Sequence, residues 1–172
     1  MTSAPIIETG SIRLRPYRMS DLEPLWEFFQ SPRAAYVDGP ANRTHLWYGF
    51  ASEAGSWGLL GQGGWSIETA DGALAGQVAV TQPPRFPERE IGWILFDGFE
   101  GRGIAYAAAK AARDWAFDTL EGCDTLVSYI DPKNTRSIAL ANRLGATHDP
   151  QAVLPEGETA AETVVYRHRR AA

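Results

Sequence analysis

Apolar and polar residues alternate over several short stretches of the chain, and this period of two predicts β-strands. Seven such strands are expected, at 12–15, 64–69, 74–81, 88–96, 125–130, 146–148 and 163–168. Between the second and third of these, Asp71-Gly72 is typical of a hairpin turn. The pattern therefore predicts a chain dominated by one sheet.

Elsewhere apolar residues recur every three or four positions, which predicts helices. Four are expected: one from Ser20 to near Gln30, one starting at Thr44, one at 104–120 and one at 137–144. Ser20 and Thr44 would be the N-caps of the first two. A turn-rich stretch at 55–64 should follow the second helix.

The resulting order is β-α-α-β-β-β-α-β-α-β-β. It predicts an α/β (α+β) fold in which one central mixed sheet is flanked by helices. The strand–helix–strand passage from 88 to 130 should be a right-handed parallel crossover. A length of 172 residues is typical of a single domain, expected to span 1–172.

Composition excludes several classes of protein. With 16 Lys and Arg against 21 Asp and Glu, the net charge is −5, whereas nucleic-acid binders are usually basic. No apolar run approaches the ~18 residues of a membrane span. The N-terminus carries no secretory signal pattern, so a cytoplasmic location is expected.

Metal and thiol chemistry are also not expected. Cys123 is the only cysteine, so it can form neither an internal disulfide nor a thiolate zinc site. His45, His148 and His168 are scattered without metal-ligand spacing and are expected at the surface or in turns. We therefore predict no metal site.

The stretch 96–105 leaves a strand through glycines and opens directly into a helix. Free amides at a helix N-terminus bind phosphates. A P-loop would need Lys at the position of Ile104, and a dinucleotide fingerprint would need Gly at that of Tyr106. A pyrophosphate loop for coenzyme A and a plain tight turn remain as alternatives.

This stretch resembles motif A of the GCN5-related N-acetyltransferase (GNAT) superfamily, written Gln/Arg-x-x-Gly-x-Gly/Ala. Gly103 and Ala105 match its last two specified positions, whereas Glu100 departs from the first. Residues 131–146 are similar to the superfamily's Asn-x-x-Ser…Leu-Gly segment, and residues 9–21 to the opening of its RimJ/RimL-like branch.

The resemblance implies a splayed sheet, with the pantetheine arm of acetyl-CoA lying between strands 88–96 and 125–130. The residues implied to bind acetyl-CoA are Trp93, Ile94 and Leu95 along the pantetheine and thioester, Gly101, Arg102, Gly103, Ile104, Ala105 and Tyr106 around the pyrophosphate, and Asn134 at the pantetheine arm. Asn134 could alternatively be only a helix-start residue.

The resemblance also suggests residues for the chemistry. Glu90 is the candidate general base, directly or through a water, unless it is only an edge glutamate. Many relatives use a Tyr where this chain has Ala141, so Ser137 becomes the candidate hydrogen-bond donor to the leaving thiolate, unless it only forms local hydrogen bonds in its own helix. Trp47 and Tyr48 are candidates to line the acceptor pocket.

The function expected is that of an acetyl-CoA-dependent N-acetyltransferase acting by direct transfer to a primary amine. The partner would be a protein N-terminus or a small-molecule amine, with no nucleic acid and no membrane, and a homodimer is compatible with the sequence. The alternative is a catalytically inactive acyl-CoA-binding or sensor module of the same fold.

Overall fold

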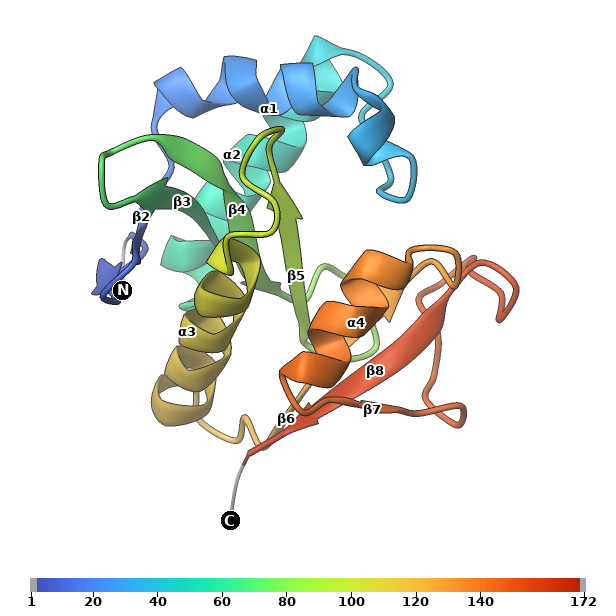
Figure 1. The fold of residues 1–172 in the computed structure, drawn as a ribbon. Helices are drawn as coiled ribbons and strands as arrows, with labels where there is room; N and C mark the ends of the chain where they lie inside the picture. Colours follow the sequence, from blue (N-terminus) through green and yellow to red (C-terminus); the bar gives the residue numbers. More distant parts are fainter. Residues whose placement is uncertain (1–2, 171–172) are drawn as a thin grey trace.

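A computed structural model of the chain describes residues 3–170 (Figure 1). Its strands are β1 (Ile7–Glu8), β2 (Ile12–Arg15), β3 (Gly64–Thr69), β4 (Leu74–Thr81), β5 (Glu90–Leu95), β6 (Thr125–Ile130), β7 (Thr147–His148) and β8 (Val164–Arg169). Its helices are α1 (Leu22–Phe29), α2 (Arg43–Leu60), α3 (Ile104–Thr119) and α4 (Thr135–Arg143), with 3-10 turns η1 (Met19–Asp21) and η2 (Pro32–Ala34). Apart from the short β1 and the two turns, each element corresponds to a predicted one.

The eight strands form one sheet in the order β1-β2-β3-β4-β5-β6-β8-β7. Neighbouring strands are antiparallel except β5 and β6, which are parallel and joined through α3. The predicted mixed sheet with one parallel crossover is confirmed. The parallel pair lies in the middle of the sheet, and the candidate site is built there.

Helices cover both faces of the sheet. In Figure 1, α3 and α4 lie on the near side, whereas α2 lies behind. Trp57 of α2, Trp65 of β3 and Trp115 of α3 contact one another edge to face, with ring centroids 4.5–5.3 Å apart. Such aromatic contacts add ~0.5–1.5 kcal/mol each to the burial of apolar area. This cluster packs the second half of α2 against β3 and α3.

Helix α2 is longer than predicted. It runs through Gly55 and Gly58 to Leu60, where the sequence predicted turns. Each helical glycine costs about 1 kcal/mol, but burial of Phe50 and Trp57 outweighs that cost. Its N-cap is Asn42 rather than Thr44, because the Asn42 side chain accepts hydrogen bonds from the first free amides of the helix.

The predicted N-cap Ser20 is also wrong. Residues 19–21 form the turn η1, and α1 begins only at Leu22. The cause is Asp21, whose buried carboxylate accepts two hydrogen bonds from Arg15 at 2.7 and 2.9 Å and one from Ser66 at 2.7 Å. A buried carboxylate is tolerable only with such partners, and they decide how the chain enters α1.

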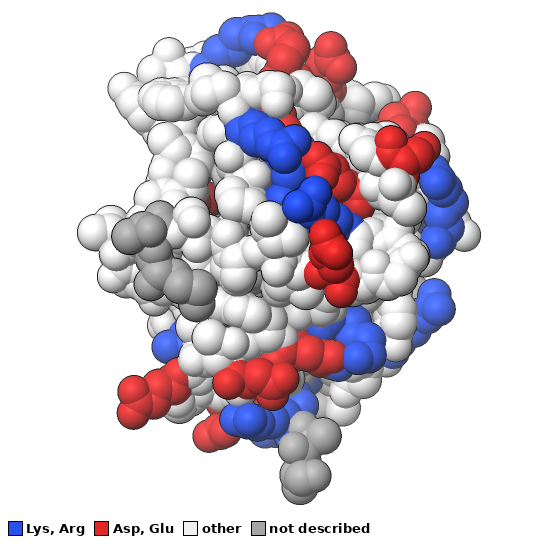
Figure 2. Space-filling model, turned by 90° about the vertical axis from the view of Figure 1, so that its left-hand side faces the viewer, with Lys and Arg blue, Asp and Glu red and all other residues white. Residues whose placement is uncertain are grey.

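Acidic and basic side chains are intermingled on the face shown in Figure 2, without one broad basic patch. Within residues 3–170, no helix has both the length and the apolar character that crossing a membrane requires.

Candidate active site

The parallel strands β5 and β6 share one registered pair, Glu90 with Val127, and then diverge. Next to it, the Val127 amide donates to the Arg89 carbonyl at 2.9 Å. Strand residues point their N–H and C=O to alternate sides, so Trp93 directs both groups toward the side that β6 has left. Buried backbone groups need partners, and a ligand in this gap can supply them.

A buried Ser–His pair lies at the point of divergence. The Ser128 hydroxyl donates to the Ile91 carbonyl at 2.7 Å and lies 3.1 Å from Nε2 of His168. Burial lowers the pKa of His168 to about 4, with Arg113 adding to the effect, so the imidazole is neutral. Because the hydroxyl proton is used on Ile91, Nε2–H donates to Ser128. The pair fixes where the strands part.

The expectation that His168 lies at the surface or in a turn is therefore wrong, since it is 1% exposed. Its strand ends in a polar run, Arg167 to Arg170, that is typical of a solvated edge. Pairing of β8 between β6 and β7 buries the imidazole side instead.

The loop between β5 and α3 is built from glycines in the left-handed region. Gly98, Gly101 and Gly103 have φ of 84°, 69° and 76°, and a Cβ at each would meet nothing within 4 Å. Gly103 is the N-cap of α3 and supplies no side chain, so the first helical amides stay open to a ligand. These residues fit the phosphates of a co-substrate, which the helix dipole would also attract.

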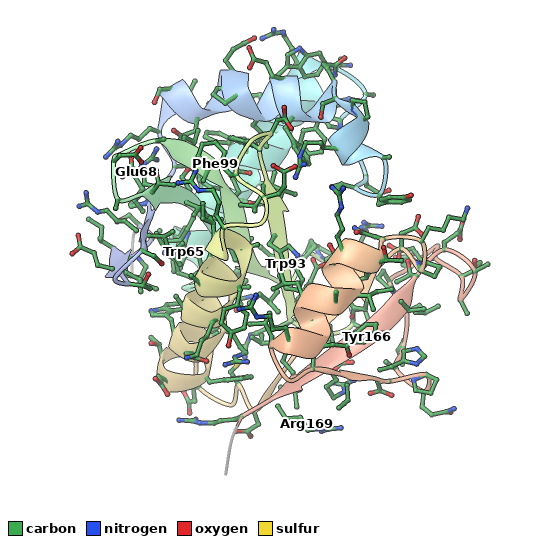
Figure 3. All side chains as sticks on the ribbon, viewed as in Figure 1. Trp65, Glu68, Trp93, Phe99, Tyr166 and Arg169 are labelled. Carbon is green, nitrogen blue, oxygen red and sulfur yellow. The ribbon has the colours of Figure 1, made fainter. Side chains whose placement is uncertain are left out.

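The other candidate residues of this segment lie beside the glycines or in the first turn of α3. Arg102 lies over the Phe99 ring, 5.6 Å from its centroid. Ile104, Ala105 and Tyr106 form the first turn of α3. Figure 3 shows Phe99 in the loop and Trp93 on β5, between α3 and α4.

A cavity of about 750 Å³ opens onto the gap between β5 and β6. Its walls come from β4, β5 and β6, from residues 35–38 after η2, and from the segment 156–163. The candidate site residues that the structure brings together on this cavity are Glu90, Trp93, Ile94, Asn134 and Ser137.

Trp47 and Tyr48 are not among the residues that line the cavity. They are 42% and 62% exposed on α2. The residue that α2 contributes to the wall is Glu53. Leu95 and the 101–106 segment also lie outside the cavity, as a separate loop beyond the end of β5.

Two carboxyl groups are the prominent feature of the cavity wall. Burial raises the pKa of Glu90 to about 8, the negative charge of Glu53 adds to the rise, and the Tyr129 amide opposes it. Burial also raises the pKa of Glu53, against a 2.5 Å hydrogen bond from the Tyr17 hydroxyl. Glu90 can thus hold or release a proton near neutral pH.

Asn134 and Ser137 lie together at the start of α4. The Asn134 side chain accepts a hydrogen bond from the Ser137 amide at 3.2 Å and caps the helix. The helix-start role is therefore observed, and its N-cap explains why α4 begins at Thr135 rather than at Ser137. Both residues line the cavity, while Ala141 is fully buried and offers no hydroxyl.

Sequence reasoning missed Tyr17 and Glu53. The only local signal was Gly63-Gly64, at the start of β3. A Cβ on Gly64 would come within 2.6 Å of the Glu53 carboxylate, and one on Gly63 within 2.7 Å of Nε1 of Trp57. Gly64 therefore leaves room for the Tyr17–Glu53 pair against the sheet, and Gly63 leaves room for the backbone of α2 and for Trp57.

A splayed sheet, a glycine loop that opens a helix, and an acid-lined cavity beside the gap fit a group-transfer enzyme with a phosphate-bearing donor. The comparisons with known proteins agree. The family described as "Acetyltransferase (GNAT) domain" matches residues 11–147, and the chain belongs to this family of acetyltransferases.

Solved structures show the same architecture. An acetyltransferase from Agrobacterium tumefaciens is 41% identical, with 98% of this chain and 96% of that chain covered and a TM-score of 0.89. A GNAT-family acetyltransferase from Bacillus anthracis is 18% identical, with 95% and 96% covered and a TM-score of 0.73. RimL, a ribosomal L7/L12 alpha-N-protein acetyltransferase, is 18% identical, with 96% and 93% covered and a TM-score of 0.73.

Proposed function

We propose that the enzyme transfers the acetyl group of acetyl-CoA directly to a primary amine. The observation that supports an amine as the acceptor is the acidity of the cavity beside the gap. Its ionisable acidic and basic lining consists of Arg85 and seven acids, Asp38, Glu53, Glu90, Asp131, Glu156, Glu158 and Glu162. Such a wall favours a cation, and an amine is a cation at neutral pH.

The donor would lie across the gap and the glycine loop. The amides of Gly101 through Tyr106, with Arg102, would hold the pyrophosphate. The N–H and C=O of Trp93, which face the gap, together with Ile94 and Leu95, would hold the pantetheine arm and thioester, and Asn134 would bind the arm from α4. The Trp93 N–H is also our candidate to stabilise the oxyanion.

The reaction would proceed in one transfer without an acetylated enzyme. Glu90 takes the proton from the ammonium group, directly or through a water. The free amine attacks the thioester carbonyl, a C–N bond forms, and the C–S bond breaks, and the nitrogen then gives its second proton to the departing thiolate, directly or through a water. The thiolate leaves with a hydrogen bond from Ser137, because Ala141 provides no phenol. Holding the two reactants in contact supplies much of the rate.

Two acceptor classes remain in this proposal, a protein N-terminus and a small-molecule amine. The RimJ/RimL-like opening at residues 9–21 supports the first. The half-enclosing walls at 35–38 and 156–163 are compatible with both.

The test has two stages. Thermal unfolding is measured with acetyl-CoA, NAD or ATP, and a ligand at 100 times its Kd should raise Tm by roughly 5–11 °C. Amines and N-terminal peptides are then incubated with acetyl-CoA, and a mass increase of one acetyl group is sought. Stabilisation by NAD or ATP would contradict the assignment of acetyl-CoA as the donor. Binding of acetyl-CoA without transfer to any amine would favour the inactive binding module.

A further inference from the structure

An arginine from a distant segment reaches the loop expected to bind phosphates. Arg33, in η2, forms an ion pair through Nη1 with Oε1 of Glu100. Its Nε also donates to the Leu95 carbonyl at 3.2 Å, at the end of β5. One side chain therefore connects η2, the last residue of β5 and the loop that precedes α3.

The position of Arg33 is itself fixed. The Ser31 side chain accepts a hydrogen bond from the Arg33 amide at 3.3 Å, and its hydroxyl donates to the Phe28 carbonyl at 2.7 Å. The Arg33 side chain is 20% exposed and that of Glu100 is 39% exposed. The guanidinium is thus held between two elements rather than free in solvent.

Glu100 is unfavourable for the loop in which it stands. The glycine turns and the N-terminus of α3 attract anions through their amides and the helix dipole. A carboxylate between Gly98 and Gly101 opposes that attraction and would repel the phosphates of coenzyme A. The loop's own cation, Arg102, lies over Phe99. The cation that pairs with Glu100 comes instead from η2, as Arg33.

We propose that Arg33 is a positioning residue for the coenzyme loop. It neutralises Glu100 and ties the loop to the end of β5, so that the loop can accept phosphates. The proposal rests on the function proposed above, in which this loop binds coenzyme A. Two of the guanidinium nitrogens are already used on Glu100 and Leu95, which favours charge compensation over direct contact with the phosphates.

The segment that contains Arg33 would also link the binding regions of the two substrates. Residues 35–38, directly after η2, line the acceptor cavity. The same short segment therefore positions the coenzyme loop through Arg33 and supplies part of the acceptor wall.

Calorimetric titration with coenzyme A tests this proposal and needs no acceptor. Arg33→Gln should weaken binding about tenfold, whereas Glu100→Gln should bind at least as tightly as the wild type. The double variant should return to within about threefold of Glu100→Gln, because the repelling charge is gone. Arg33→Lys should lie between the wild type and Arg33→Gln, since it keeps the charge but loses the fork of donors.

Salt and stability separate charge compensation from a structural role. The difference between Arg33→Gln and Glu100→Gln should shrink at 1 M salt, where the Debye length falls to about 3 Å. The unliganded Tm should change little, because the pair is partly open to solvent and such ion pairs contribute only ~0–1 kcal/mol. Arg43→Gln is the matched control, since Arg43 pairs with Glu23 at 2.5 Å on the surface, and it should leave binding unchanged.

Three outcomes would overturn the proposal. An unchanged affinity of Arg33→Gln for coenzyme A would show that Arg33 has no role in coenzyme binding. A double variant as weak as Arg33→Gln would mean that Arg33 contacts the phosphates directly. Failure of the wild-type protein to bind coenzyme A would refute the proposed function, and the role of Arg33 would fall with it.

Discussion

The two sides of the candidate active site are built in different ways. The proposed coenzyme side comes mainly from one continuous stretch, β5, its glycine loop and the first turn of α3, with Asn134 added from α4, and it presents mainly backbone groups. The proposed acceptor side is assembled from Tyr17, residues 35–38, Glu53 and residues 156–163, and it presents side chains.

This difference follows from what each side would bind. Backbone amides and a helix dipole recognise phosphates through geometry that a few glycines determine, so the same loop serves a fixed co-substrate. Side chains from separate segments can change one at a time, and they can select among acceptors. The three experiments below compare the two sides, starting with the largest expected effect.

Gly103→Glu should remove coenzyme binding and, with it, turnover. The new carboxylate fills the open space at the start of α3 and repels phosphates. Losing two charge-assisted hydrogen bonds of ~1.5–3 kcal/mol each would lower affinity at least about a hundredfold, measurable by calorimetry.

Gly122→Glu is the matched control for this variant. Gly122 also has a positive φ, 65°, and open space at its Cβ, but it lies beyond the other end of α3. Both variants should lose ~1–2 kcal/mol of stability to backbone strain. If the two bound coenzyme A equally well, the phosphate role of the 101–106 loop would be refuted.

The same difference explains what the sequence could predict. Gly103 and Ala105 stand at fixed offsets along one segment, so the loop, α3 and the parallel crossover were all predictable. The strand alternation that places Glu90 on the same face as Gly92 is equally local.

The acceptor side was not predictable, because its residues meet only through tertiary packing. Glu53 lies in a helix whose glycines indicate turns, and Tyr17 reaches it only because Gly64 leaves space. Arg33 likewise finds Glu100 across the fold, and His168 is buried only by the pairing of its strand. None of these contacts produces a periodic pattern in the sequence.

Glu90→Gln should lower kcat by about 10²–10⁴ while leaving coenzyme affinity unchanged. In the wild type, kcat should rise with pH through about 8, because the base acts when deprotonated. Glu121→Gln, at an exposed position outside the cavity, is the control. An unaltered kcat and pH profile in Glu90→Gln would exclude Glu90 as the base.

The same variant should be more stable than the wild type at high pH. A carboxyl whose pKa is raised on folding contributes its stability below its unfolded pKa, and that contribution is lost as pH rises through about 8. The Tm advantage of Glu90→Gln should therefore grow between pH 5 and pH 9. A constant difference in Tm would contradict a raised pKa at Glu90.

Glu53→Gln should have the smallest effect of the three, a displacement of the pH profile. Its negative charge adds to the raised pKa of Glu90, so removing it should move the midpoint of kcat to lower pH. At pH 7 the variant should then keep a larger share of its own maximal rate than the wild type does, measured at saturating acetyl-CoA and amine. Coenzyme affinity should not change, because Glu53 belongs to the acceptor side. A midpoint that stays in place while the KM for the amine rises would make Glu53 a binding residue for the acceptor rather than a group that tunes Glu90.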